Sequence, residues 1–225
     1  MPRRALTRSI KAKPLPPEVA ARYLLRWSRR DLYHHPEAFP RLDSPALFGN
    51  DYPLELEVGC GTGEFLCGLA GQERGANFVG VEPWTKVVSR AAETAAEQKL
   101  DNIRFVRAPM ESLYGLLVPD SLRAVYVHYP DPNIRSKGQH KVFNATFLEA
   151  MHRALEAGGR LSVISDHEEL FAEMLGLVEQ DPRWQKMHAE RYLVGYEPEV
   201  KSRYQLLWEK HDVPPLRFEV EKRAS

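Results

Sequence analysis

"LELEVGCGTGEFL", residues 54 to 66, is the segment of the sequence that says most about the fold. A short run suited to a strand comes first, three glycines at alternate positions follow, and an apolar segment of helical character comes next. Because glycine has no Cβ, the backbone of such a turn can approach a ligand closely and adopt unusual φ values. The stretch therefore predicts a ligand-binding loop between a strand and a helix.

The spacing and the flanking charges of this loop restrict its ligand. Gly59, Gly61 and Gly63 form GxGxG, whereas a dinucleotide-binding loop has GxGxxG, and here Glu64 occupies the sixth position. No Lys-Ser or Lys-Thr pair follows, as a phosphate-binding P-loop requires. Glu57 and Glu64 place a carboxylate on each side of the turn. A ligand that carries positive charge is therefore favoured over a pyrophosphate.

Strands and helices alternate along most of the chain. Short apolar strands separated by helices of this length pair in parallel through right-handed crossovers. Two more strands near the C-terminal end have no helix between them and are expected to pair antiparallel. The predicted fold is α/β: a doubly wound, mostly parallel, seven-stranded sheet with an antiparallel C-terminal strand pair, which binds ligands beyond the carboxyl ends of its strands. The expected strands are 54–58, 77–82, 103–108, 124–129, 160–165, 202–210 and 216–222, and the expected helices are 64–73, 84–100, about 141–156 and 167–180.

The N-terminal part of the chain is expected to be organised separately. Residues 1–13 read as a basic flexible arm, residues 14–53 as a helical segment (one helix over 17–30) followed by a loop, and residues 54–225 as the main domain. The first 30 residues carry nine Lys or Arg against one acid, and the remainder carries 22 basic and 30 acidic residues. A basic arm on an acidic body favours a nucleic-acid partner, and a solubilising tail is the alternative.

The composition of the chain argues against a membrane protein, a secreted protein and a metal site. No apolar run approaches the roughly 20 residues that span a bilayer, so no membrane partner is expected. The N-terminal segment lacks the apolar stretch of a secretion signal, which favours a cytoplasmic protein. The two cysteines, Cys60 and Cys67, supply neither a disulfide framework nor the four ligands of a structural zinc site, so no metal is expected. A monomer is favoured.

Glu82 ends the second expected strand, 19 residues after Gly63. A carboxylate in this position can accept hydrogen bonds from both hydroxyls of a ribose. Glu82, Glu57 and the GxGxG loop together resemble class I S-adenosylmethionine-dependent methyltransferases. The resemblance implies S-adenosylmethionine as cofactor, with Glu57 and the glycines at its methionine end and Glu82 on its ribose.

A second motif narrows the resemblance to one family. "HYPDPNIRSKGQHK" (128–141) and "FLEAMHRALEAGGRLSVISD" (147–166) look like the corresponding segments of bacterial tRNA (guanine-N7)-methyltransferases, over roughly residues 54–222. The resemblance implies that tRNA is the partner and that Asp131 is catalytic. It also implies that a set of substrate-binding residues holds the RNA backbone and the guanine: Arg135, Lys137, His140, Lys141 and Asp166.

The chemistry of guanine N7 explains a carboxylate at Asp131. N7 has a free lone pair and no proton, so methyl transfer needs orientation more than a general base. The purine becomes cationic as the methyl arrives, and a fixed carboxylate favours that developing charge. Pro130 and Pro132 stiffen the backbone on both sides of Asp131, which suits a positioned group.

The sequence departs from the family pattern on both sides of the site. After the third strand, Ala108 stands where the family has an acid for the adenine amine, so adenine is expected to contact backbone groups and Met110. At the acceptor side, "SRYQLL" aligns with the family's Thr-x-Phe-Glu-x-Arg motif. Ser202, Tyr204 and Gln205 are assigned there to substrate binding, although Gln205 lacks the charge of the family's glutamate. Two further departures are Asn133, in place of a tryptophan, and Leu207, in place of a basic residue.

The leading interpretation is S-adenosylmethionine-dependent methylation of guanosine N7 in tRNA. Three others remain open: a methyltransferase of the same fold that acts on another RNA nucleotide or a small molecule, a non-catalytic RNA-binding module, and a dehydrogenase. The departures at Ala108, Gln205 and Leu207 favour the first of these, and the intact carboxylates at Glu57, Glu82 and Asp131 argue against the second. Glu64, in place of a third glycine, argues against the dehydrogenase.

Overall fold

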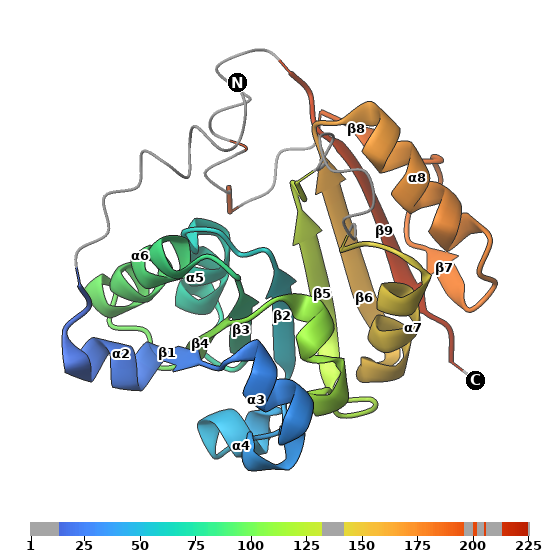
Figure 1. The fold of residues 1–225 in the computed structure, drawn as a ribbon. Helices are drawn as coiled ribbons and strands as arrows, with labels where there is room; N and C mark the ends of the chain where they lie inside the picture. Colours follow the sequence, from blue (N-terminus) through green and yellow to red (C-terminus); the bar gives the residue numbers. More distant parts are fainter. Residues whose placement is uncertain (1–13, 132–141, 196–199, 202–204, 206–212, 225) are drawn as a thin grey trace.

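A single sheet with helices on both faces forms the centre of the protein (Figure 1). The computed structural model describes residues 14–131, 142–195, 200–201, 205 and 213–224. Within these residues the sheet has nine strands in the order β1-β4-β3-β2-β5-β6-β9-β7, and β8 also pairs with β9. The strands are β1 (Leu24–Arg26), β2 (Leu54–Val58), β3 (Asn77–Val81), β4 (Ile103–Arg107), β5 (Leu122–His128), β6 (Leu155–Ser165), β7 (Trp184–Lys186), β8 (Leu193–Val194) and β9 (Leu216–Lys222).

The helices lie between the strands along the chain. The α-helices of the described residues are α2 (Pro17–Tyr23), α3 (Arg29–His34), α4 (Ser44–Phe48), α5 (Glu64–Gln72), α6 (Thr85–Glu97), α7 (Ala145–Ala154) and α8 (Glu168–Glu179). Three short 3₁₀ helices are η1 (Pro36–Ala38), η2 (Met110–Ser112) and η3 (Tyr114–Leu116). None of the helices in the described part of the chain is both long and apolar enough to cross a membrane.

The predicted α/β class and parallel core are confirmed. The five expected parallel strands are present as β2 to β6, and each pairs in parallel with its neighbour in the sheet. From the central strand β2 the chain moves outward through β3 and β4 and then returns to the other side of β2 as β5. This reversal lies between β2 and β5, and ligands of doubly wound sheets bind at such a point, beyond the carboxyl ends of the strands.

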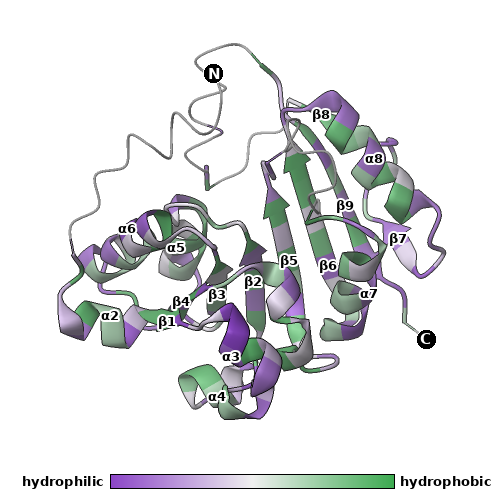
Figure 2. Cartoon of the chain, in the orientation of Figure 1, coloured by the Kyte–Doolittle hydropathy of each residue, from purple (hydrophilic) through white to green (hydrophobic). Residues whose placement is uncertain are grey.

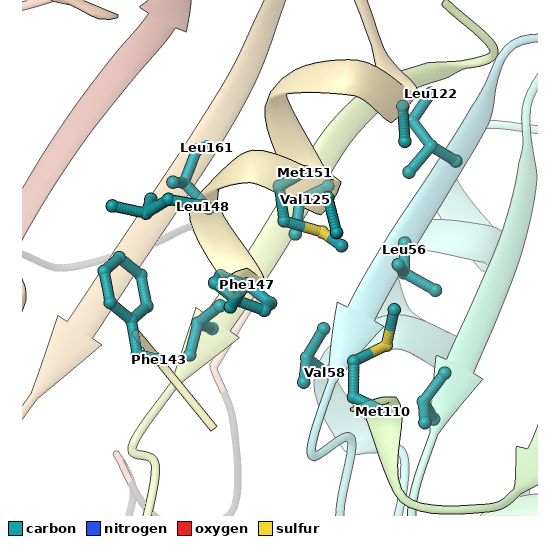
Figure 3. Close-up of a cluster of buried hydrophobic side chains, with 14 of the residues drawn as sticks. Leu56, Val58, Met110, Leu122, Val125, Phe143, Phe147, Leu148, Met151 and Leu161 are labelled. Carbon is teal, nitrogen blue, oxygen red and sulfur yellow. The ribbon is translucent and has the colours of Figure 1, made fainter. Parts of the chain in front are cut away.

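Two apolar clusters, one on each face, hold the helices to the sheet. Alternate residues of one strand belong to different clusters: Phe78 packs with α5 and α6, whereas Val79 packs on the opposite face. Figure 3 shows part of this second cluster, where Phe147, Leu148 and Met151 of α7 lie over the sheet. The helices themselves carry both hydrophilic and hydrophobic residues (Figure 2), as expected of elements with one buried face.

Residues 17–30 do not form the single helix that their apolar spacing predicts. Helix α2 ends at Tyr23, and β1 follows and pairs in parallel with β4, with Leu24 opposite Phe105. Helix α3 then begins after Ser28, whose Oγ accepts a hydrogen bond from the backbone N–H of Asp31 at 3.0 Å. The edge of β4 would otherwise carry unpaired backbone groups. Pairing with that edge therefore outweighs the local helical preference of residues 24–26.

The C-terminal strands also differ from the expectation. Strand β9 is present as predicted and pairs antiparallel with β6. Its other antiparallel partners are β7 and β8, two short strands that the sequence pattern does not indicate. The expected strand 202–210 lies outside the described residues except for Gln205, which is not in a strand. With β1, β7 and β8, the described sheet has nine strands rather than seven.

Gly80 in β3 makes room for the turn that follows β2. A Cβ on Gly80 would lie 2.7 Å from Sγ of Cys60 and 2.7 Å from a ring carbon of Phe105. Cys60 is part of the glycine turn, and it is buried, as is Cys67. The absence of a side chain at position 80 therefore lets the turn pack directly on the sheet.

We expect Gly80→Ala to lower the free energy of unfolding by about 1–3 kcal/mol, because the added methyl overpacks a filled core. Gly176→Ala is the matched control, since Gly176 lies in α8 and a Cβ there has nothing within 4 Å. The control should gain about 0.5–1 kcal/mol from better helix propensity. Urea unfolding measures both variants, and a Gly80→Ala protein as stable as the wild type would contradict this packing.

Candidate functional site

The parallel strands bring the predicted cofactor residues together at one edge of the sheet. Strands β4, β3, β2, β5 and β6 are neighbours in that order, so the residues that follow them are arranged in the same order along their carboxyl edge. They are Ala108 after β4, Glu82 after β3, the glycine turn after β2, Asp131 three residues after β5, and Asp166 after β6.

The three glycines of the turn all have positive φ, but they serve different purposes. The N–H groups of Gly59 and Cys60 both donate to the carbonyl of Val81, at 2.8 and 3.1 Å, which fixes the turn on β3. A Cβ on Gly63 would lie 2.8 Å from Cβ of Ala91, so Gly63 allows α5 to pack on α6. At Gly59 and Gly61 a Cβ would meet nothing within 4 Å. These two positions therefore leave backbone open to a ligand.

Glu82 joins the turn to the start of α6. One oxygen of its carboxylate accepts a hydrogen bond from the N–H of Gly61 at 3.3 Å, and the other accepts from the N–H of Trp84 at 3.0 Å. Burial raises the pKa of Glu82 to about 7, although the two N–H donors oppose that rise. A carboxylate has about four acceptor positions, so Glu82 can still accept hydrogen bonds from a ligand's hydroxyls.

Glu57 is a buried carboxylate with an unsatisfied oxygen. The residue is 3% exposed, and its Oε2 has no hydrogen-bond partner in the described part of the chain. Burial, followed by repulsion from Glu64 and Glu82, raises the pKa of Glu57 to about 8. A buried acceptor without a donor is unfavourable. A ligand that brings a cationic N–H group would satisfy it.

Three carboxylates therefore surround the turn. Glu64 begins α5, and its carboxylate accepts a hydrogen bond from the hydroxyl of Thr62 at 2.7 Å. The ionised form of Glu57 is repelled by Glu64 and Glu82, and a bound cation would relieve that repulsion. These three acidic side chains fit the positively charged S-adenosylmethionine better than an anionic dinucleotide.

The apolar side of the site follows β4. Ala108 and Met110 are both buried. The side chain of Met110 packs in the core near Val58 (Figure 3). The side chain of Met110 is therefore part of the core beneath this end of the sheet edge.

The chain leaves β5 through a strained turn. Tyr129 has φ of 51°, an uncommon value for a residue with a side chain and more so before a proline. It is buried, and its N–H donates to the carbonyl of Ile164 in β6 at 2.7 Å. This turn presents Asp131 on the surface, where its side chain is exposed. Strained backbone of this kind is concentrated at functional sites.

His128, at the end of β5, is unsuited to proton transfer. Its ring is buried and packs against the rings of Phe65 and Tyr126, with centroid distances of 4.5 and 5.5 Å. Burial, with the positive charges of Arg217 and Arg160, lowers the pKa of His128 to about 3. The imidazole is therefore neutral at physiological pH and has a packing role.

The acceptor side is described only in part. Asp166 is half-buried and Gln205 is 2% exposed. The ends of β5 and β6 are adjacent, with His128 paired to Ile164, so Asp131 and Asp166 follow neighbouring strands. The other predicted substrate-binding residues lie outside the described residues: Arg135, Lys137, His140, Lys141, Ser202 and Tyr204.

Three features of the site were not predicted from the sequence. Trp84, two residues after Glu82, is 69% exposed although it is a large apolar side chain. The hydrogen bond between Thr62 and Glu64 braces the turn. The positive φ of Tyr129 has no sequence signal, because tyrosine rarely adopts it. Of these three features, only Trp84 has a signal in the sequence. A tryptophan close to an expected ligand loop could have suggested a functional position.

No group of three or more His, Cys, Asp or Glu side chains is placed to hold a metal ion in the described parts of the chain.

Comparison with known proteins identifies the family. Residues 51–213 match the family model described as "Putative methyltransferase". A tRNA (guanine-N(7)-)-methyltransferase of Rubrobacter xylanophilus is 49% identical over 221 residues, which cover 98% of this chain and 99% of the relative. An enzyme with the same name from Chloroherpeton thalassium is 38% identical over 215 residues, which cover 95% of each chain.

A solved structure agrees with the fold. It is a protein from Streptococcus mutans, described as "a putative methyltransferase" in complex with SAH, with a TM-score of 0.53 and 14% sequence identity. The alignment covers 77% of this chain and 90% of that one. The identity and coverage of the two sequence relatives carry the assignment further: the chain belongs to the tRNA (guanine-N7)-methyltransferase family.

Proposed function

We propose that this protein transfers a methyl group from S-adenosylmethionine to N7 of a guanosine in tRNA. One observation supports this most directly: the open glycine turn, with Glu57, Glu64 and Glu82 around it, follows β2, and Asp131 follows the neighbouring strand β5. The names of the two sequence relatives agree with it.

On the donor side, where S-adenosylmethionine would bind, each residue has its own proposed contact. Glu57 would receive the cationic amine, the open backbone at Gly59 and Gly61 would lie along the methionine part, and Glu82 would accept the ribose hydroxyls. Ala108 and Met110 would support the adenine. When bound, S-adenosylmethionine supplies a methyl group on a positively charged sulfur.

On the acceptor side, the chain's own residues need to orient guanine and stabilise charge. Guanine N7 carries no proton, so no general base is required. The neutral, buried His128 is consistent with that requirement. Asp131 is the candidate catalytic residue, because a carboxylate at this position would favour the positive charge that develops on the purine.

The remaining assignments extend the proposal to the whole tRNA. Arg135, Lys137, His140 and Lys141 would contact the RNA backbone, and the basic arm 1–13 would add phosphate contacts. Asp166, Ser202, Tyr204 and Gln205 would contact the guanosine. We also propose that the protein acts as a monomer in the cytoplasm, where its substrate is found.

The direct test is a methyl-transfer assay on unmodified tRNA with labelled S-adenosylmethionine, followed by nucleoside analysis. Label on 7-methylguanosine is the expected result. Label on a ribose, on an exocyclic amine or on another base would refute the choice of atom, and absence of label would refute the proposed substrate.

We expect Asp131→Asn to lower kcat on tRNA by about 10²-fold, because loss of a preorganised charge acts mainly on the transition state. Its folding and its affinity for S-adenosylmethionine should not change, since the side chain is exposed. Asp51→Asn is the control, because Asp51 is also exposed but precedes β2 at the opposite edge of the sheet. Single-turnover rates measure the effect. Equal rates in the wild type, Asp131→Asn and Asp51→Asn would show that Asp131 takes no part in the mechanism.

The pKa of Glu57 is raised to about 8. We therefore expect the affinity for S-adenosylmethionine to rise as the pH increases from about 6 to about 8. Because that pKa is raised above its usual value, the free protein holds a proton on Glu57 at neutral pH, and a cationic ligand binds better once the proton has left. Titration calorimetry at several pH values measures this slope. Glu57→Gln should flatten it, and an unchanged slope in that variant would assign the pH dependence to another group.

A further inference from the structure

Two arginines are neighbours at the last strand of the sheet. Arg26 ends β1, which pairs only with β4 among the described strands, and Arg26 is in register with Arg107 of β4. Leu24 and Phe105, two residues earlier, belong to the buried cluster beneath α6, so the two arginines point to that same face. Neighbouring strands lie about 4.8 Å apart, and like charges so close repel each other. The pair is therefore unfavourable in the free protein.

Helix α3 adds two more arginines beside this pair. Strand β1 runs parallel to β4, so α3, which follows β1, begins beyond the same carboxyl edge. Its Arg29 and Arg30 are exposed, as is Arg26, whereas Arg107 is half-buried. We call Arg26, Arg29, Arg30 and Arg107 the arginine patch. Asp31 is the single acid among the residues of β1, α3 and β4.

No acid compensates the charge of the arginine patch. In the described part of the chain none of its four members forms an ion pair with an aspartate or a glutamate. Arginines elsewhere in the structure differ, since each of the following has a glutamate oxygen within 2.9 Å: Arg90, Arg123 and Arg183. The arginine patch is therefore a concentration of positive charge that an anionic partner would stabilise.

An exposed aromatic side chain accompanies the patch. Tyr33 is 81% exposed and lies in α3, three residues after Arg30 and four after Arg29, so the three side chains share one side of the helix. The ring of Tyr33 meets that of His34 edge to face, with 5.1 Å between centroids. Surfaces that bind unpaired nucleotides combine cations for the phosphates with rings for the bases. This combination favours RNA over an acidic protein as the partner.

The arginine patch lies on the side of the donor site away from Asp131. Along the sheet, β4 and β1 follow β3, whereas β5 lies on the other side of β2. Four strand spacings separate β5 from β1, which corresponds to roughly 19 Å. Phosphates follow one another closely along an RNA backbone, so a tRNA with its guanosine at Asp131 can extend over the patch.

We propose that the arginine patch is a phosphate-binding surface for tRNA, where RNA phosphates neutralise the like charges of Arg26 and Arg107. The inference rests on the proposed function, because the identity of the RNA comes from there. It adds a contact surface that belongs to the folded sheet. It predicts that the patch contributes to the affinity for tRNA and to its salt dependence, and that it does not contribute to the binding of S-adenosylmethionine.

Arg26→Gln/Arg107→Gln tests the patch through the affinity for tRNA at several salt concentrations. Each phosphate contact steepens the fall of log K with log salt by about 0.9, so the slope should become shallower by about 1.8 in this variant. Between about 50 and about 200 mM salt, the affinity of the wild type should therefore fall about 10-fold more than that of the variant. The Kd for S-adenosylmethionine should be the same in both proteins.

Lys99→Gln/Arg223→Gln is the matched control, because it removes two positive charges from the opposite edge of the sheet. Lys99 lies between α6 and β4, and Arg223 follows β9, which runs antiparallel to β6. Both residues are exposed, and neither forms an ion pair within the described residues. The control should keep the salt slope of the wild type. Equal slopes in the patch variant and the control would overturn the proposal and leave an acidic protein as the alternative partner.

Two further variants separate the charge of the patch from its packing. Arg26→Lys/Arg107→Lys should keep the salt slope, since a lysine also neutralises a phosphate. A loss of slope in this variant as large as in the glutamine variant would overturn the proposal. Arg26→Gln alone alters an exposed side chain only and should make the slope shallower by about 0.9. An unchanged slope in this single variant would exclude Arg26 from the surface.

Binding of tRNA is measured without methyl transfer, so the two proposals can fail separately. A wild type that binds tRNA but forms no 7-methylguanosine would refute the proposed function, and the salt slopes would still decide the role of the arginine patch. Unchanged slopes together with normal formation of 7-methylguanosine would overturn the role of the patch alone.

Discussion

The hydrogen bonds of the Glu82 carboxylate are the interaction on which the donor side of the site depends. One buried side chain accepts from the N–H of Gly61 after β2 and from the N–H of Trp84 before α6. It therefore fixes the glycine turn after β2 relative to the end of the neighbouring strand, β3. Gly61 has positive φ, and a Cβ there would meet nothing within 4 Å, so side-chain packing does not hold this position and the bond to Glu82 restrains its backbone directly.

The same region carries an electrostatic cost in the free protein that a cationic donor would offset. Glu57 and Glu82 are buried, and Glu64 adds negative charge at the start of α5. Buried like charges keep their protons or attract a counter-charge. The arrangement explains why a loop so similar to a dinucleotide-binding turn would select a sulfonium compound. Asp131 is exposed after the strained turn at Tyr129, and under the proposed function it would add negative charge on the acceptor side.

The parallel core and the nearness of Glu82 to the glycine turn could be predicted because they depend on local patterns. Apolar runs bounded by helices define β2 to β6, and the GxGxG spacing followed by Glu82 at the end of β3 places the two side by side. Strand β1 could not be predicted in this way, because its backbone pairs with β4, about 80 residues away in the chain. The same holds for the space that Gly80 leaves for Cys60, since this is also a contact between segments that are distant in the chain.

The role of the Glu82 carboxylate can be measured by the binding of S-adenosylmethionine to Glu82→Gln. The glutamine keeps the size of the side chain, but its NH₂ group cannot accept from a backbone N–H, so one of the two bonds is lost. We expect a folded protein whose Kd for S-adenosylmethionine rises about 10-fold or more, since hydrogen bonds to charged groups contribute about 1.5–3 kcal/mol. A folded Glu82→Gln protein that binds S-adenosylmethionine as tightly as the wild type would contradict it.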